Sequence, residues 1–368
     1  MSAEAATAAQ VRSFVAGRKR RTHLGFLILA LVVILSVVVA LTSGPIAIPP
    51  QRLWALARST FDGQSSGQSS PGLARDALVL FNIRLPRIVL ALLLGAALGV
   101  SGALMQGLFR NPLADPGIAG ISSGAALAAA LMIVLGHHIT GVDAALMQTV
   151  VMPLAAFLGG LIATMFLYGI ATREGQTSVA TMLLAGIALA ALAMACIGLL
   201  IFISDDRQLR DITFWTLGSL GGANWQKVSV VAPMVTLLLG AMPFLARGMN
   251  ALSMGGAAAF HLGVPVQIIK TVCIVLVALA VGVSVAAAGT IGFVGIVVPH
   301  LLRLAIGADY RALLPMSAMA GAALLVIADA IARTIVAPAD LPIGILTALI
   351  GGPFFLWLLL RRNRNIDL

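Results

Sequence analysis

Residues 88–105 read IVLALLLGAALGVSGALM, residues 125–136 read AALAAALMIVLG, and between them residues 110–124 read RNPLADPGIAGISSG. The first run, together with its neighbours, is long enough to cross a bilayer, whose hydrocarbon core needs about 20 apolar residues in a helix. The middle stretch holds two prolines, an arginine and an aspartate. Proline cannot continue a regular helix, so this pattern predicts two membrane helices joined by a polar connection.

The same apolar character runs through the whole chain. Its 368 residues are 60% hydrophobic and only 10% charged, with a mean hydropathy of +1.06. A soluble protein carries about 25% charged residues, so most of this surface must face something apolar. The composition therefore predicts an all-α polytopic membrane protein. The net charge of +10 comes with basic ends and does not indicate nucleic acid as a partner.

Apolar runs separated by polar residues predict about ten transmembrane helices. Their expected ranges are 24–42, 88–108, 118–136, 149–170, 180–203, 228–246, 267–289, 291–306, 313–333 and 342–360. An even number of spans puts both termini on one side, and the basic residues of the two ends mark that side as cytoplasmic. We thus expect a basic cytoplasmic arm (1–23), a single ten-helix domain (24–360) and a cytoplasmic tail (361–368).

The chain lacks the residues that would let it hydrolyse ATP alone. A phosphate-binding loop ends in Gly-Lys-Ser/Thr, and none of the three lysines, Lys19, Lys227 and Lys270, has that context. Cys196 and Cys273 both lie in apolar runs, without metal-ligand spacing. We therefore expect no enzyme activity and no cofactor or metal. Energy for uphill transport would have to enter through another subunit.

Several long motifs, in order, resemble one family. They are RLPRIVLALLLGAALGVSGALMQGLFRNPLADPGIAGISSGA (84–125), LLAGIAL (183–189), FWTLGSLGGANW (214–225), GTIGFVGIVVPHLLRLAIGADYRALLP (289–315), ADAIAR (328–333) and LPIGILTALIGGPFF (341–355). They are similar to the permease subunits of ABC importers for ferric siderophores, haem and cobalamin. The resemblance implies a homodimer in a bacterial inner membrane, with two ATPase subunits and a periplasmic substrate-binding protein.

Three arginines occupy motif positions expected on the external side. In the family that the chain resembles, arginines matching Arg84, Arg87 and Arg333 receive acidic residues of the binding protein. The alternative is that they anchor the protein by reaching toward lipid headgroups. Asp329 lies one turn before Arg333 and is expected to pair with it, which would weaken the docking role of Arg333.

Arg207 and Arg210 belong to the stretch SDDRQLRDITFW, which we expect to be an external loop. They would either form a basic rim at the mouth of the pathway or be neutralised by the aspartates beside them. The stretch resembles haem permeases, and arginine suits the two carboxylates of haem. Haem is therefore the first expected substrate. Ferric siderophore and cobalamin are alternatives within the family, and an ion-coupled secondary transporter is the alternative from another class.

The resemblance also assigns roles on the cytoplasmic side. It implies an ATPase coupling loop, whose acidic residue after the first glycine is missing here, and a cytoplasmic gate at the start of the fifth span. It leaves residues 110–116 as either a plain turn or a hinge beside the pathway. The coupling loop comprises Leu252, Ser253, Met254, Gly255, Gly256, Ala257, Ala258, Ala259, Phe260, His261, Leu262 and Gly263; the gate comprises Ser178, Val179 and Ala180; the hinge comprises Arg110, Asn111, Pro112, Asp115 and Pro116.

Overall fold

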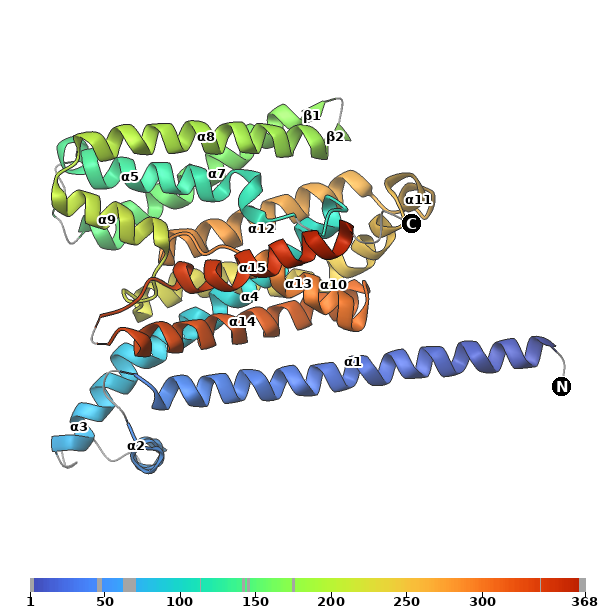
Figure 1. Ribbon diagram of the computed structural model, residues 1–368, viewed down its shortest axis with the longest axis horizontal. Helices are drawn as coiled ribbons and strands as arrows, with labels where there is room; N and C mark the ends of the chain where they lie inside the picture. Colours follow the sequence, from blue (N-terminus) through green and yellow to red (C-terminus); the bar gives the residue numbers. More distant parts are fainter. Residues whose placement is uncertain are drawn as a thin grey trace.

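The computed structural model describes residues 3–44, 48–61, 71–112, 114–140, 143, 146–173, 176–337 and 339–363. Nearly all of these residues are helical (Figure 1). The helices are α1 (Ala3–Thr42), α2 (Pro50–Phe61), α3 (Pro71–Leu78), α4 (Leu85–Leu108), α5 (Ile121–Thr140), α7 (Met152–Ala171), α8 (Val179–Ile203), α9 (Asp206–Leu217), α10 (Trp225–Ser253), α11 (Gly256–His261), α12 (Val266–Ala288), α13 (Val294–Ile306), α14 (Tyr310–Ile335) and α15 (Ile343–Asn363). Two π-helical segments (Val79–Arg84 and Met147–Val151), a 3-10 turn (Pro116–Ala119) and a two-stranded hairpin of β1 (Thr172–Arg173) and β2 (Gln176–Thr177) complete the elements.

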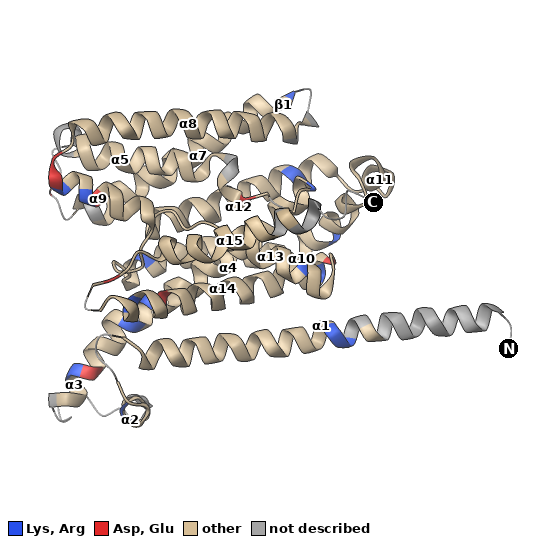
Figure 2. Cartoon of the chain, in the orientation of Figure 1, with Lys and Arg blue, Asp and Glu red and all other residues tan. Residues whose placement is uncertain are grey.

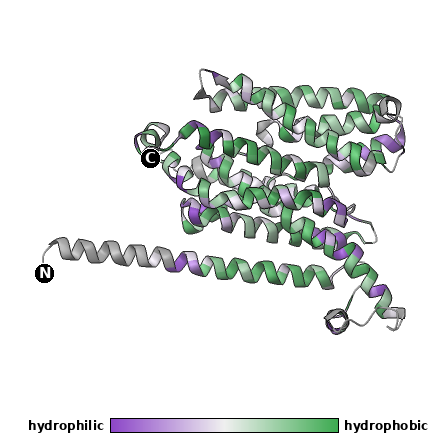
Figure 3. Cartoon of the chain, turned by 180° about the vertical axis from the view of Figure 1, so that it is seen from behind, coloured by the Kyte–Doolittle hydropathy of each residue, from purple (hydrophilic) through white to green (hydrophobic). Residues whose placement is uncertain are grey.

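The membrane-spanning pattern agrees with the sequence. Among the described residues, seven helices are long and apolar enough to cross a membrane, and three shorter apolar helices lie at 121–136, 294–306 and 343–357. Together they match the predicted spans one for one. Both termini lie at the same end of the bundle (Figure 1). Charged residues gather toward the two ends, and the hydrophobic colour fills the middle (Figures 2 and 3), as a bilayer requires.

Two stretches are more ordered than the sequence suggests. The basic arm is part of α1, which is one continuous helix from Ala3. The connection between the first two spans contains α2 and α3, which the apolar pattern did not reveal. The second span also begins earlier than predicted, since an unbroken helical stretch of 37 residues runs over 72–108. At about 1.5 Å per residue this stretch is longer than a bilayer core is thick, so it projects beyond the membrane.

The centre of the bundle is α4, which packs closely against α14. In the α4 span 83% of the residues are buried, compared with 11% in the α1 span and 22% in the α8 span. A methyl group at Gly95 would overlap the carbonyl oxygen of Gly321, and one at Gly99 would overlap that of Ser317. The GxxxG pattern of α4 therefore allows the two backbones to touch, as such patterns do in lipid. By contrast, α1 and α8 lie at the edge of the bundle.

Candidate functional site

The three motif arginines converge at the external end of α4 and α14, and all are buried within the chain. Arg84, Arg87 and Arg333 are 3%, 6% and 4% exposed. Arg84 donates a hydrogen bond to the carbonyl oxygen of Leu41, and Arg333 donates one to that of Ala40 at 3.3 Å. These two side chains thus bind the last carbonyl groups of α1. Positive charge at this position is stabilising, because the C-terminal end of a helix carries the negative end of its dipole.

Two aspartates complete this cluster. Asp329 of α14 lies between Arg87, at 2.9 Å from its Nε and Nη2 atoms, and Arg333, at 3.0 Å from its Nε atom. Asp340, in the connection between α14 and α15, lies 2.9 Å from Nη1 of Arg87. The side chain of Asp329 is 2% exposed, whereas that of Asp340 is 38% exposed. The expected pair of Asp329 and Arg333 is confirmed, and it extends into a larger buried network.

The sequence did not predict this burial. Docking of a partner and anchoring to lipid headgroups both call for guanidinium groups that are accessible, whereas these three are covered by the chain itself. Buried charges are costly unless they are paired, and the two aspartates supply that pairing within the protein. The cluster therefore joins α1, α4, α14 and the connection before α15. Docking by Arg84, Arg87 and Arg333 stays a prediction.

The stretch expected to be an external loop is in fact helix α9. Asp205 caps this helix by accepting a hydrogen bond from the Gln208 backbone amide at 2.8 Å, and the Gln208 side-chain oxygen accepts one from the Asp205 backbone amide at 3.1 Å. Asp-x-x-Gln is a capping-box spacing, so the sequence held a signal for this helix that we did not use. The polar residues that suggested a loop lie on the exposed face of α9.

Helix α9 borders an external cavity of about 640 Å³. Arg207 lines the cavity, while Arg210 is exposed and is not among its lining residues. Lys227, at the start of α10, also lines it and donates a hydrogen bond to the carbonyl oxygen of Ala287 at 3.0 Å. Its other lining residues include Met132, Ile133, Met147, Met152, Asp205, Asp211, Phe214 and Trp215. Two cations and two carboxylates therefore share a cavity whose other lining residues are mostly apolar.

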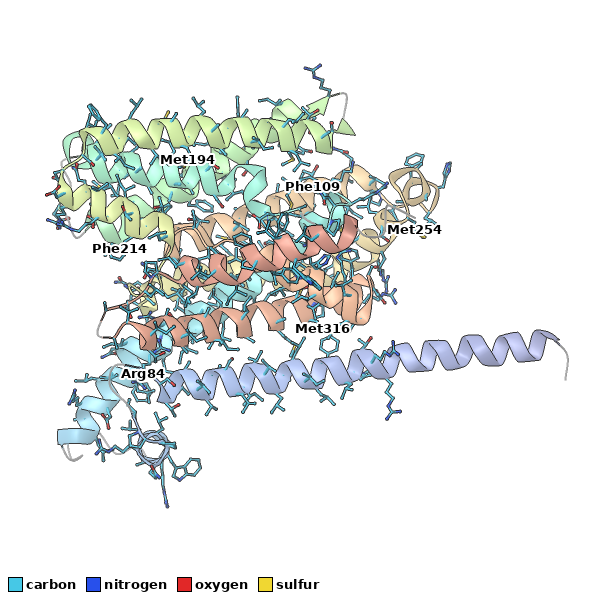
Figure 4. The ribbon with its side chains drawn as sticks, viewed as in Figure 1. Arg84, Phe109, Met194, Phe214, Met254 and Met316 are labelled. Atoms are coloured by element: carbon cyan, nitrogen blue, oxygen red, sulfur yellow. The ribbon has the colours of Figure 1, made fainter. Side chains whose placement is uncertain are left out.

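The predicted coupling segment forms the far cytoplasmic end of the bundle. Helix α10 ends at Ser253, and α11 covers Gly256–His261 between Gly255 and Gly263, both of which have positive φ. Its large apolar side chains are unusually open: Met254, Phe260 and Leu262 are 65%, 71% and 62% exposed. Met254 is visible at this end in Figure 4, close to α11. Exposed apolar clusters of this size are often contact surfaces for other proteins, and the coupling role of this segment stays a prediction.

The predicted hinge is a connection between two separate spans. Asp115 caps the 3-10 turn by accepting a hydrogen bond from the Gly117 amide at 2.6 Å. Burial raises the pKa of the Asp115 carboxyl, and that hydrogen bond offsets the rise only partly. Pro116 packs against Gly295 of α13, and the exposed Arg110 lies beside the coupling segment at Gly255. The turn is thus observed, and bending during transport stays a prediction.

The predicted gate lies at the start of α8, directly after the hairpin. Ser178 caps the helix, because its hydroxyl group accepts a hydrogen bond from the Thr181 amide at 3.3 Å. Serine is one of the residues that commonly cap helices in this way. Ala180 is exposed, and the side chain of Val179 lies outside the described residues. The closing role of this strip stays a prediction.

Comparisons with known proteins identify the family. The model of the FecCD transport family matches residues 29–361. The chain belongs to the FecCD transport family. It is 48% identical over 289 residues to the hemin transport system permease protein HmuU of Yersinia pestis, covering 78% of this chain and 84% of that protein. It is 43% identical over 290 residues to the cobalamin import system permease protein BtuC of Halobacterium salinarum, covering 78% and 74% respectively.

A solved structure agrees with this assignment. An inward-facing conformation of a metal-chelate type ABC transporter has a TM-score of 0.76 and 32% identity, covering 91% of this chain and 98% of that one. This FecCD protein is therefore a multi-pass inner-membrane permease of the ABC importer type, as the motifs predicted.

Some residues of this FecCD chain escaped the sequence analysis because their partners lie far away along the chain. Asp340 reaches Arg87 across 253 positions. On the cytoplasmic side, Asn250 of α10 donates a hydrogen bond to Asp309 at 2.8 Å and accepts one from the Tyr310 amide at 2.9 Å. The buried Tyr310 hydroxyl group receives a hydrogen bond from Arg303 at 2.7 Å. Three of these residues, Arg303, Asp309 and Tyr310, lie in the motif of residues 289–315.

Proposed function

We propose that this protein is the permease that carries haem from the periplasm to the cytoplasm. The observation that carries the proposal is the 48% identity to a hemin permease, over 84% of that protein's length. Cobalamin is the second candidate, because the chain is 43% identical to a cobalamin import permease. We infer further that two copies of the chain work with two separate ATPase subunits and a periplasmic substrate-binding protein.

The external cavity supports haem on physical grounds. Haem is a flat apolar ring with two carboxylates, and the cavity combines apolar side chains with the cations Arg207 and Lys227. Asp205 and Asp211 balance this charge, so binding would be modest. Modest binding suits a permease, because substrate must be released on the far side. Of the two arginines predicted at the mouth, Arg207 has the better position for this role.

Exposed apolar surface supports the proposed assembly. Met254, Phe260 and Leu262 offer an ATPase a site for apolar side chains, without the acidic residue usual in relatives. Helix α8 offers a second copy, or lipid, an apolar surface that includes Met194, Leu199 and Phe202, which are 66%, 69% and 87% exposed. Met194 is labelled in the middle of this edge helix in Figure 4. Large, apolar interfaces of this kind are typical of permanent assemblies.

The proposed docking of a binding protein has to use a cluster that is already paired. One side of the Arg87 guanidinium group pairs with the deeply buried Asp329, and the other side pairs with Asp340, which is partly exposed. An acidic side chain of the binding protein would therefore compete with Asp340 rather than meet an open arginine. Electrostatic attraction of this kind mainly raises the rate of association.

Transport by the reconstituted complex tests the proposal directly. Liposomes containing the permease and its ATPase would receive haem, a ferric siderophore or cobalamin on equal amounts of loaded binding protein, in parallel. We expect ATP-dependent uptake of haem, and no ATP hydrolysis by the permease alone. Uptake of cobalamin or a siderophore without haem would make the substrate assignment wrong. Uptake driven by an ion gradient without the ATPase would make the transporter class wrong.

A further inference from the structure

Helix α2 carries a large aromatic side chain that the chain leaves uncovered. Trp54 is 73% exposed, while Leu56 on the same helix is 5% exposed and Ile48 just before it is 1% exposed. Because each residue turns a helix by about 100°, Trp54 and Leu56 project on nearly opposite sides. Helix α2 is therefore attached to the protein by one side and presents its indole ring outward on the other.

The direction of α2 differs from that of the spanning helices. In Figure 1 α1 and α14 run across the view, whereas α2 is seen end-on as a ring, and the view from behind in Figure 3 shows the same. Helix α2 thus runs across the direction of α1 rather than along it. Since α1 crosses the membrane, α2 lies roughly parallel to the membrane surface.

The level of α2 follows from the lipid-facing surface of α1. Val38 and Val39 are 50% and 51% exposed on this edge helix, one turn before its end at Thr42. Apolar surface, and with it the hydrocarbon of the outer leaflet, therefore extends nearly to the end of α1. Helix α2 lies beside that end, on the side away from the bundle (Figure 1). It is thus at the depth where acyl chains give way to headgroups.

The residues of α2 suit this depth. Tryptophan is enriched at membrane interfaces, where its ring is half in apolar and half in polar surroundings. Helices that lie in the interface combine such residues with arginine or lysine on the polar face. Helix α2 has Arg52 and Arg58, and Arg52 is tied to Asp76 of α3 by a 3.2 Å ion pair.

We infer that α2 is an interfacial anchor whose Trp54 inserts between the phospholipids of the outer leaflet. Through the pair of Arg52 and Asp76, the anchor also holds the helical stretch that leads to Arg84. The lipid surface thereby fixes the depth of the buried arginine cluster. This inference does not depend on the substrate or on the partners proposed above.

Fluorescence quenching in lipid nanodiscs tests the anchor. The chain has four tryptophans, so the difference between the wild-type protein and Trp54→Phe isolates the signal of Trp54. The substitution is mild, because most of this side chain touches nothing in the protein. The nanodiscs would contain phosphatidylcholine brominated either near the headgroup or near the chain end, and iodide would serve as the aqueous quencher. We expect strong quenching by shallow bromine, less by deep bromine and almost none by iodide.

A matched control moves the indole by one position. Ala55 is exposed and projects about 100° away from Trp54, toward the polar side of α2. The double variant Trp54→Phe, Ala55→Trp should show the opposite pattern, with iodide quenching and little effect of bromine. The inference is overturned if iodide quenches Trp54 while brominated lipid does not, since α2 would then lie in water. Quenching by neither would also overturn it, because a second protein would cover the ring.

Discussion

Arg87 of α4 and Asp329 of α14 form a buried ion pair with two nitrogens of the guanidinium group within 2.9 Å of one carboxylate oxygen. The two helices also touch through Gly95 and Gly321, so the pair lies at the end of a close helix contact. Arg333 and Asp340 extend the pair on either side. The external end of the permease is therefore held by charge and its middle by close backbone packing.

Replacing Asp329 by Asn should destabilise the protein strongly. Arg87 and Arg333 would both lose their buried carboxylate, and breaking a buried pair costs about 3–5 kcal/mol. The expected result is a clearly lower melting temperature in nanodiscs and a lower yield of folded protein. Asp206→Asn is the control, because Asp206 is exposed on α9, and it should behave like the wild-type protein. Equal melting temperatures for both variants would show that the pair is unimportant for stability.

Replacing Asp340 by Asn should speed docking of the substrate-binding protein. The change removes the partly exposed carboxylate that competes for Arg87, while Asp329 keeps the arginine paired. We expect a higher association rate at low salt, measured by surface plasmon resonance with the permease in nanodiscs, and almost unchanged stability. Reversal of Arg87 to Glu is a poorer probe, because it would bury a second carboxylate against Asp329. An association rate that Asp340→Asn leaves unchanged would argue against docking at this cluster.

Arg207 and Arg210 should differ in their effect on haem uptake. Arg207→Ala removes a cation from the external cavity, and loss of one charged hydrogen bond corresponds to about a ten-fold slower rate. Arg210→Ala is the matched control, since Arg210 does not line that cavity. Basal ATP hydrolysis should persist in both. The dimethyl ester of haem, delivered on equally loaded binding protein, should be insensitive to Arg207→Ala. Equal rates for the two variants would leave Arg207 without a substrate role.

Phe260→Ala should weaken the contact with the ATPase subunits. A buried aromatic side chain in an interface contributes about 2 kcal/mol or more, and Phe260 is the most open of the large side chains near α11. The expected outcome is less ATPase recovered with the affinity-purified permease, and less ATP hydrolysis stimulated by the binding protein. Leu31→Ala, on the lipid-facing side of α1, is the control and should copurify normally. Full recovery of ATPase with Phe260→Ala would move the contact elsewhere.

Asp115→Asn should raise stability at neutral pH. Burial raises the pKa of Asp115 in the folded protein. When pH increases and the carboxyl group ionises, the folded state therefore becomes less stable relative to the unfolded state. Asparagine keeps an oxygen for the Gly117 amide without this penalty. The stability advantage of Asp115→Asn should therefore be absent below the ordinary pKa of aspartate, about 4, and grow as pH rises through the folded-state pKa. Thermal unfolding across pH measures it. Asp115→Ala loses the cap as well as the charge, so it should be less stable than Asp115→Asn by about 1 kcal/mol at every pH. A pH-independent difference between Asp115→Asn and the wild-type protein would refute the burial argument.

The sequence by itself determined the class of the protein. Long apolar runs fix the number of spans, because a bilayer leaves few other places for so many apolar residues. The polar stretch after α4, the cap at Ser178 and the absence of a phosphate loop are local features, and local spacing is enough to read them. The motifs of residues 84–125 and 289–315 identified the family for the same reason.

The tertiary structure alone decided the surroundings of the charged residues. Arg87 contacts Asp340 only because α4 lies beside α14. The local sequence around either residue does not indicate a partner 253 positions away. Arg84 and Arg333 are buried because they hold the end of α1. Helices α2 and α9 were missed because their polar faces interrupt the apolar pattern. Helix periodicity is a property of neighbouring residues, whereas burial and ion pairing depend on which helices the fold brings together.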